Sequence, residues 1–207
     1  MRTYGLKAAA LCACLALAAC GKKDNAADTT AAARTDSAAA APAPAANAPL
    51  NDANIMAAIS MANDEEIADA RLADSMAANA NVKAFARDMV KDHSAMKSDG
   101  DKLASKEHIT PAPPPNADAE RQRGESEMSQ MRGAGKGAAF DKAYIDDQVA
   151  DHQAALDKLN QFQAQAQDTA LKAMITKALP KVQQHLQRAK DIQGKLGSAP
   201  AAAPKTD

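Results

Sequence analysis

The stretch VKAFARDMVKDHSAMKSDGDKL, residues 82–103, decides the fold. Its apolar side chains recur three, four or seven residues apart, with charged residues between them, which is the spacing of one face of an α-helix. The residues on this face are Val82, Phe85, Met89, His93, Met96 and Leu103. The pattern predicts a long amphipathic helix that ends before the proline-rich segment 110–115, because prolines cannot continue it.

Three other segments repeat this pattern. We expect long helices over about 51–78, 138–165 and 168–196, and a shorter one over about 118–131, which Gly133, Gly135 and Gly137 would end. Pro180 lies inside the last long helix and is expected to kink it or break it. Four long helices, joined by two tight turns and one long crossover that carries the short helix, predict an all-α four-helix bundle.

The composition favours helices and argues against some classes of function. The chain of 207 residues has no Trp, three Phe and two Tyr, so it is poor in the residues that fill sheets. A net charge of -1 argues against a nucleic-acid partner, which would need a basic patch. The sequence contains no Gly-x-Ser-x-Gly motif and no glycine-rich phosphate loop after a strand. We therefore expect a protein that is not an enzyme.

The N-terminus carries the features of a secretory signal. Two cations, Arg2 and Lys7, precede an apolar run over residues 8–19, which is too short to cross a membrane. The run ends in Leu-Ala-Ala followed by Cys20, which resembles the bacterial lipoprotein processing box and implies cleavage before a lipidated Cys20. An ordinary cleaved signal that ends near a cysteine is the alternative.

This interpretation divides the chain into four parts. Residues 1–19 are the expected signal peptide, 20–50 a lipidated cysteine and disordered Ala/Pro-rich tether, 51–196 the bundle, and 197–207 a disordered tail. The expected partner is the membrane, through the lipid anchor, and the sequence identifies no protein partner. Gly21 follows Cys20 where an Asp commonly signals inner-membrane retention, so we expect the outer membrane of the bacterial envelope, facing the periplasm.

Three of the four histidines lie on the apolar faces of different helices, namely His93, His152 and His185. The first helix has no histidine, but Glu66 and Asp69 interrupt its apolar face. Counting from the two predicted turns places Glu66 level with His93, and His152 within about one helical turn of His185. Imidazole and carboxylate at one level predict a site for one divalent transition metal, with Glu66 and the three histidines as ligands.

Zn or Cu is preferred over di-iron, and Asp69, Asp92 and Asp151 are candidates for an outer shell that orients the ligands. This metal site is the alternative interpretation. The first interpretation is a non-enzymatic, periplasm-facing lipoprotein whose bundle serves an interaction or stress-protection role, with the same histidines and Glu66 in a polar network without an ion. The fourth histidine, His108, follows the second helix and is expected to be exposed.

Three motifs together resemble a known family. They are residues 82–93, the FDKAY string of residues 140–144 followed by His152, and Leu179-Pro180 followed by His185-Leu186. They are similar to the exported bacterial family named domain of unknown function 4142, which implies a ferritin-like four-helix fold over about 51–196 and no established activity. Ferritin-like di-iron proteins use a Glu-x-x-His pair on each of two helices. Here valine stands three residues before each histidine, at Val90, Val149 and Val182.

Overall fold

The computed structural model describes residues 49–198, and this part of the chain is helical and contains no strand. Its five helices are α1 (Asp52–Met76), α2 (Ala80–Lys106), α3 (Ala117–Gly133), α4 (Ala138–Gln165) and α5 (Thr169–Ser198). The predicted all-α bundle is confirmed. The expected signal peptide, tether, lipidated Cys20 and most of the tail lie outside the described residues.

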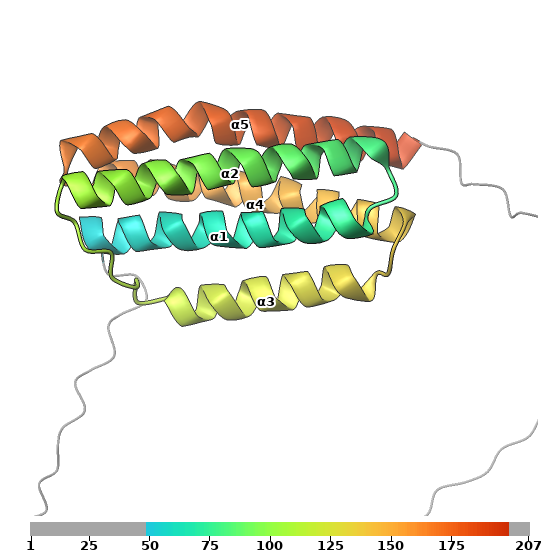
Figure 1. Cartoon of the computed structure of the whole chain (residues 1–207), viewed down its shortest axis with the longest axis horizontal. Coiled ribbons are helices and arrows are strands. Elements are labelled where there is room, and N and C mark those ends of the chain that lie inside the picture. Colours follow the sequence, from blue (N-terminus) through green and yellow to red (C-terminus); the bar gives the residue numbers. More distant parts are fainter. Residues whose placement is uncertain (1–48, 199–207) are drawn as a thin grey trace, which may run out of the picture. The chain divides into compact units, whose positions relative to one another are not determined.

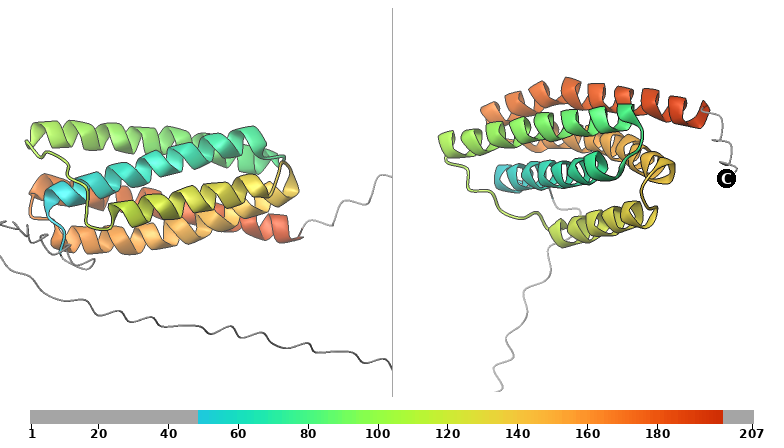
Figure 2. Two further views of the ribbon diagram at one scale, coloured as in Figure 1. Left: turned by 90° about the horizontal axis from the view of Figure 1, so that it is seen from below. Right: turned by 45° about the vertical axis from the view of Figure 1, so that its right-hand side comes forward.

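The four long helices form two hairpins that pack side by side. The first hairpin joins α1 to α2 and the second joins α4 to α5, while α2 also packs against α5 and α1 against α4. The shorter helix α3 runs along the outside of the bundle, next to α1 and α4 (Figures 1 and 2). Of the helices in the described region, none is both long and apolar enough to cross a membrane.

Side-chain caps fix the helix starts that the sequence suggested. Asn51 Oδ1 accepts a hydrogen bond from the amide of Asn54 at 2.9 Å, and the Asn54 side chain accepts one from the amide of Asn51, which completes a capping box. Asn79 caps α2 through the amide of Asn81 at 2.8 Å. Asp168 accepts from the amide of Leu171 at 2.7 Å and so caps α5.

The first helix ends at Met76, two residues before the predicted end at Ala78. The cause is a carboxylate from the other hairpin, since Asp141 accepts hydrogen bonds from the amides of Ala78 at 2.9 Å and Asn79 at 3.0 Å. Asp52 holds the α4–α5 turn in the same way, through the amides of Gln167 and Asp168. Each hairpin turn is therefore held by a carboxylate near the start of the opposite hairpin.

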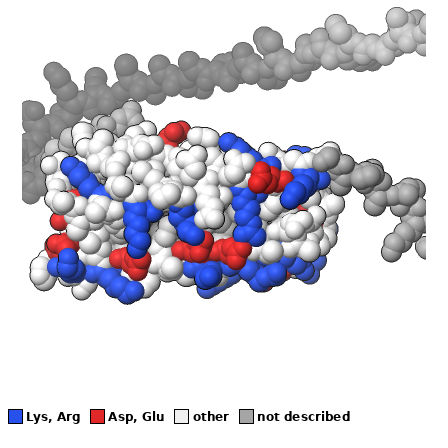
Figure 3. Space-filling view, turned by 90° about the horizontal axis from the view of Figure 1, so that it is seen from above, with Lys and Arg blue, Asp and Glu red and all other residues white. Residues whose placement is uncertain are grey.

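Pro180 does not break α5, which is a single helix from Thr169 to Ser198. The ribbon of α5 is bowed (Figure 1), as expected when a proline removes one hydrogen bond within a helix. The surface over α5 and α2 carries Lys and Arg next to Asp and Glu, without a large area of either sign (Figure 3).

The apolar core has two main clusters, near the two ends of the bundle. One cluster lies near the α1–α2 turn and includes Ala73, Val82, Phe85, Phe140, Tyr144 and Ile192. The other includes Ile55, Met56, Ala104, Ala166, Leu171 and Ile175. Apart from Asp141, the buried polar residues of the four long helices fall between these two clusters. With the nearly buried Glu66 they form a polar layer, which consists of Asn63, Glu66, Asp69, His93, Gln148, His152 and His185.

Candidate functional site

Three histidines from three helices meet in the polar layer. His93 of α2, His152 of α4 and His185 of α5 are 6%, 1% and 4% exposed. Their ring centroids are 5.3 to 5.8 Å apart, and one ring nitrogen of each lies within 4.8 Å of one from each of the others. The structure therefore brings together the three histidines that the sequence placed at one level. The exposed His108 is not part of this group.

Each imidazole is anchored through one nitrogen. The three contacts are His93 Nδ1 with Asn63 Oδ1 at 2.9 Å, His152 Nδ1 with the carbonyl oxygen of Gln148 at 3.0 Å, and His185 Nε2 with Asp92 Oδ2 at 3.0 Å. Asn63 donates its amide to the carbonyl oxygen of Ile59 at 2.9 Å, which turns Oδ1 towards His93. All three anchors are oxygen acceptors, so the anchored nitrogen of each ring carries the hydrogen.

The opposite nitrogen of each ring is then an unprotonated lone pair. These atoms are His93 Nε2, His152 Nε2 and His185 Nδ1, and all three are buried without a hydrogen-bond partner. A neutral imidazole whose other nitrogen donates to a carbonyl or carboxylate is the usual form of a metal-binding histidine.

Burial keeps the rings neutral. It lowers the pKa of His93 to about 3, with further lowering from His152 and His185, and it lowers the pKa of His152 to about 4. The pKa of His185 is also lowered, because burial outweighs the hydrogen bond to Asp92. Partial burial acts to raise the pKa of Asp92, but hydrogen bonds from His185 and Lys181 outweigh it and hold this pKa below its usual range.

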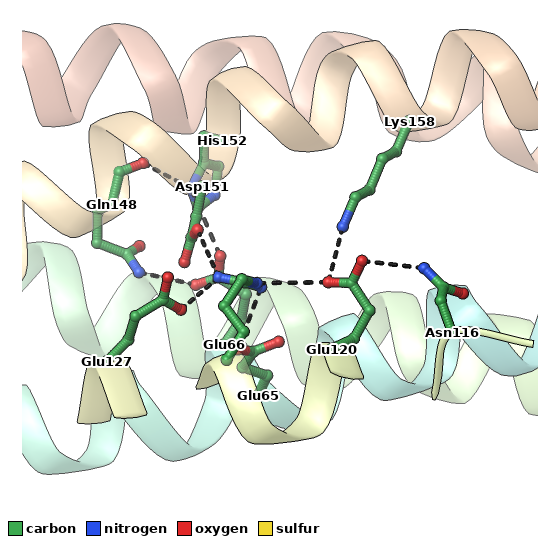
Figure 4. Close-up of polar contacts among 10 residues, drawn as sticks. Glu65, Glu66, Asn116, Glu120, Glu127, Gln148, Asp151, His152 and Lys158 are labelled. Atoms are coloured by element: carbon green, nitrogen blue, oxygen red, sulfur yellow. Dashed lines mark hydrogen bonds and ion pairs between the residues drawn. The ribbon is translucent and has the colours of Figure 1, made fainter. Parts of the chain in front are cut away.

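Glu66 lies outside this group of three donors, although we predicted it as the fourth ligand. Its carboxylate lies 3.6 Å from Nδ1 of His152, the nitrogen that already bonds to Gln148, and it accepts a hydrogen bond from the Gln148 side chain at 3.0 Å (Figure 4). Counting residues gave the height of Glu66 along the bundle, but not its angle around α1. Glu66 is thus placed to orient His152 and Gln148.

The candidate outer-shell residues divide between two neighbourhoods. Asp92 contacts His185, as predicted. Asp151 instead faces α3, where it pairs with Arg123 at 3.2 Å. Asp69 is 2% exposed and makes no hydrogen bond to a histidine. Asp151 belongs to a second group of possible metal donors with Glu127 and Asp147, whose carboxylate oxygens lie within 4.8 Å of one another.

A cavity of about 270 Å³ connects the histidines with the surface. His93 and His152 line its inner part, together with Glu66, and the apolar side chains of Met96, Leu159 and Met174 line its walls. Lys177 and Lys181 also border it. The cavity therefore reaches two of the three histidines, His93 and His152.

Sequence reasoning missed several polar residues of this layer. Gln148 lies four residues before His152, one helical turn away, so its spacing alone could have identified it. Asn63 lies three residues before Glu66 and could have been found in the same way. The contribution of Glu127 and Arg123 on α3 had no signal, because the placement of that helix could not be derived from the sequence.

Comparison with curated proteins and with solved structures gave no match. A family model matches residues 35–192, which include all five helices up to Ile192 and every residue of the polar layer. The chain therefore belongs to the family described as Domain of unknown function (DUF4142).

Proposed function

We propose that the bundle binds one divalent transition metal ion through His93, His152 and His185, and that the protein is a metal-binding or sequestering protein of the bacterial envelope. The observation that carries the proposal is the set of three buried ring nitrogens without partners, each on a ring whose other nitrogen donates to an oxygen. This arrangement supplies three lone pairs on rings whose orientation is already fixed.

The competing function is an interaction or stress-protection module in which the same residues form a polar network without an ion. Such a network would have to pair the ring nitrogens with one another or with Glu66. The anchors leave only lone pairs facing inward, and two lone pairs cannot hydrogen bond to each other. A buried acceptor without a partner costs about 1–3 kcal/mol, so three of them favour the metal-binding proposal.

Three imidazoles suit Zn or Cu. A tetrahedral zinc ion with Zn–N bonds of about 2.0 Å places its nitrogens about 3.3 Å apart. One nitrogen of each ring lies within 4.8 Å of one from each of the others, so the rings would move closer together on binding. The fourth position would face the cavity that His93 and His152 line. We propose that this position holds a small ligand and that the protein stores or delivers the ion without catalysing a reaction.

The envelope location rests on the sequence alone. Cys20 follows Leu17, Ala18 and Ala19 at the end of a signal-like segment, and Gly21 follows it. We propose that the mature chain begins at a lipidated Cys20 and is held on the outer membrane, facing the periplasm.

The test is the metal content of the full mature chain, purified in detergent without a histidine tag. Calorimetric titration of the metal-stripped protein with Zn²⁺ and Cu²⁺ should give near one equivalent. At an ion concentration about a hundred times Kd, binding should stabilise the fold by about 2.7 kcal/mol, which corresponds to a rise in Tm of about 5–10 °C.

The variant His152→Ala should lose both the stoichiometric binding and the rise in Tm. The matched control is His108→Ala, which removes the exposed histidine and should behave as the wild type. Helical circular dichroism of each variant checks that the bundle is intact. If binding survives the loss of His93, His152 and His185 together, the ion is held elsewhere and the proposal is wrong.

A further inference from the structure

A second polar cluster lies next to the histidines, between α1, α3 and α4. We call it the acidic pocket and define it by Glu66, Asp69, Glu127, Asp147 and Asp151. On α4, Asp147 and Asp151 are four residues apart and so lie on one face, with Tyr144 one turn before them. The carboxylates of Glu127, Asp147 and Asp151 each place an oxygen within 4.8 Å of the others.

Four buried oxygen atoms in and beside this pocket have no hydrogen-bond partner. They are Asp69 Oδ1, Asp147 Oδ2, the Tyr144 hydroxyl and Gln148 Oε1. Asp69 is 2% exposed, and Tyr144 and Gln148 are fully buried. Three of the four atoms can only accept when the carboxylates are ionised, so they cannot satisfy one another. Native proteins leave few buried polar atoms unpaired, and a bound ion can satisfy several such oxygens at once.

The charges of these groups act on one another. The pKa of Tyr144 is raised by burial and then by the charges of Glu66, Asp69 and Asp147. Burial likewise raises the pKa of Asp69 to about 8, with a further contribution from Glu66. It raises the pKa of Asp147 to about 8, with contributions from Asp151 and Glu127. The groups are near enough to repel one another when ionised.

Positive charge is scarce in the acidic pocket. Arg123 of α3 pairs with Glu127, with Asp151 at 3.2 Å and with Glu65 at 3.4 Å. Within the described residues, Asp69 and Asp147 have no ion pair with a basic side chain. Buried charges are normally paired or coordinate a metal. In the metal-free chain the protons that Asp69 and Asp147 keep up to about pH 8 take the place of a cation, and a bound ion would displace them.

We propose that the acidic pocket binds a hard divalent cation of the Mg²⁺, Ca²⁺ and Mn²⁺ class, with Glu127, Asp147 and Asp151 as its ligands and the buried Asp69 beside them. All donors are oxygens, which these cations prefer, whereas the histidine group offers only nitrogens, which suit Zn and Cu. The two sites are adjacent, because Gln148 accepts from His152 and donates to Glu66. The proposal does not depend on metal binding by the histidines.

Mn²⁺ is the probe, because the paramagnetic resonance signal of free Mn²⁺ counts the bound fraction directly. The full mature chain is stripped with a chelator and titrated with Mn²⁺, in the wild type and in a variant that lacks all three clustered histidines. Both should bind one equivalent, and Mg²⁺ or Ca²⁺ in excess should displace it. If the stripped wild type binds no Mn²⁺, the acidic pocket is not a cation site.

The double variant Asp69→Asn with Asp147→Asn should lose this equivalent. The matched control is Asp157→Asn, which changes an exposed acid on α4, the helix that carries Asp147. This control should bind Mn²⁺ as the wild type does. In the metal-free state above pH 8, where both carboxyls of the wild type are ionised, the double variant should melt at a higher temperature than the wild type, because amides remove the unpaired negative charges. Mn²⁺ should not raise its Tm further. A double variant that still binds one equivalent, or that melts lower than the metal-free wild type, would overturn the proposal.

Discussion

The Nε2 of His185 lies 3.0 Å from Oδ2 of Asp92, and this contact joins α5 to α2 at the level of the three histidines. The same carboxylate oxygen accepts from Lys181 at 3.1 Å, so Asp92 is held by two donors from α5. The hydrogen bond fixes the tautomer of His185, because the carboxylate needs a hydrogen on Nε2. It leaves Nδ1 of His185 as a buried lone pair.

The first prediction follows from this contact. The variant Asp92→Asn keeps the size of the side chain but removes the charge that orients and polarises His185. We expect the affinity for Zn²⁺ to fall about 10- to 100-fold with the stoichiometry unchanged, as for other residues that support metal ligands. The control is Asp88→Asn, one turn earlier on α2, where an exposed acid pairs with Arg188. Equal losses in both variants would mean that Asp92 has no specific role.

The second prediction concerns the stability of the metal-free protein above pH 6.5. Burial raises the pKa of Glu66, Asp69 and Asp147 to about 8 in the folded chain. Between their ordinary values and pH 8, the folded state therefore holds protons that the unfolded state has released. The free energy of unfolding must fall as the pH rises through this window, by at most about 1.4 kcal/mol per pH unit for each group.

The histidines change the stability in the opposite direction, and they do so at lower pH. The folded-state pKa values of His93 and His152 are about 3 and 4, below the ordinary 6.5, so these residues cost stability only as the pH falls below 6.5. Above that value the three carboxyls dominate, together with Glu65 and Asp151, whose pKa values burial also raises. Urea unfolding of chelator-treated protein between pH 6.5 and pH 8 measures the slope. Asp69→Asn should flatten it, and an unchanged slope would contradict the assignment.

Much of the bundle followed from the sequence, because its signals are local. The three- and four-residue spacing of apolar side chains gave the helices, and α4 begins and ends where the pattern predicts, at Ala138 and Gln165. The common level of His93, His152 and His185 followed from counting residues from two turns, since each residue advances a helix by about 1.5 Å.

The features that we did not predict depend on the rotation of each helix about its axis and on contacts between residues far apart in the sequence. The angle of Glu66 around α1 decides that it contacts the anchored side of His152, and residue counting does not determine that angle. The end of α1 is set by Asp141, which lies 63 residues beyond Ala78. The acidic pocket needs the placement of α3, whose sequence carries no strong apolar face.

The third prediction tests how α3 is held. The buried residues of α3 are Ala117 and Met131, near its two ends, so its middle depends on Arg123. This side chain pairs with Glu65, Glu120, Glu127 and Asp151. In Arg123→Gln we expect amide hydrogen exchange to accelerate in α3 and to change little in the other four helices. The global loss of stability should be about 1–2 kcal/mol, because the guanidinium is partly solvated.

The matched control for this change is Arg121→Gln. Arg121 also lies on α3, but it is exposed and pairs with Asp118 and Glu125 within the same helix. Its loss should leave the exchange of α3 as in the wild type. If both variants accelerate α3 equally, the helix is held by its ends and not by the arginine network.

The last prediction concerns the anchor, which lies outside the described residues. The thiol of Cys20 is the only one left once a signal peptide ending at Ala19 is removed, so Cys20 is the residue that would carry the lipid. Globomycin should then cause the uncleaved precursor to accumulate, because it blocks the peptidase that acts on lipidated precursors. In Cys20→Ala the protein should move from the membrane fraction to the soluble fraction, with its helical content and metal stoichiometry unchanged, because the bundle does not include Cys20. A Cys20→Ala protein that still sediments with membranes would show that something other than the lipid holds it there.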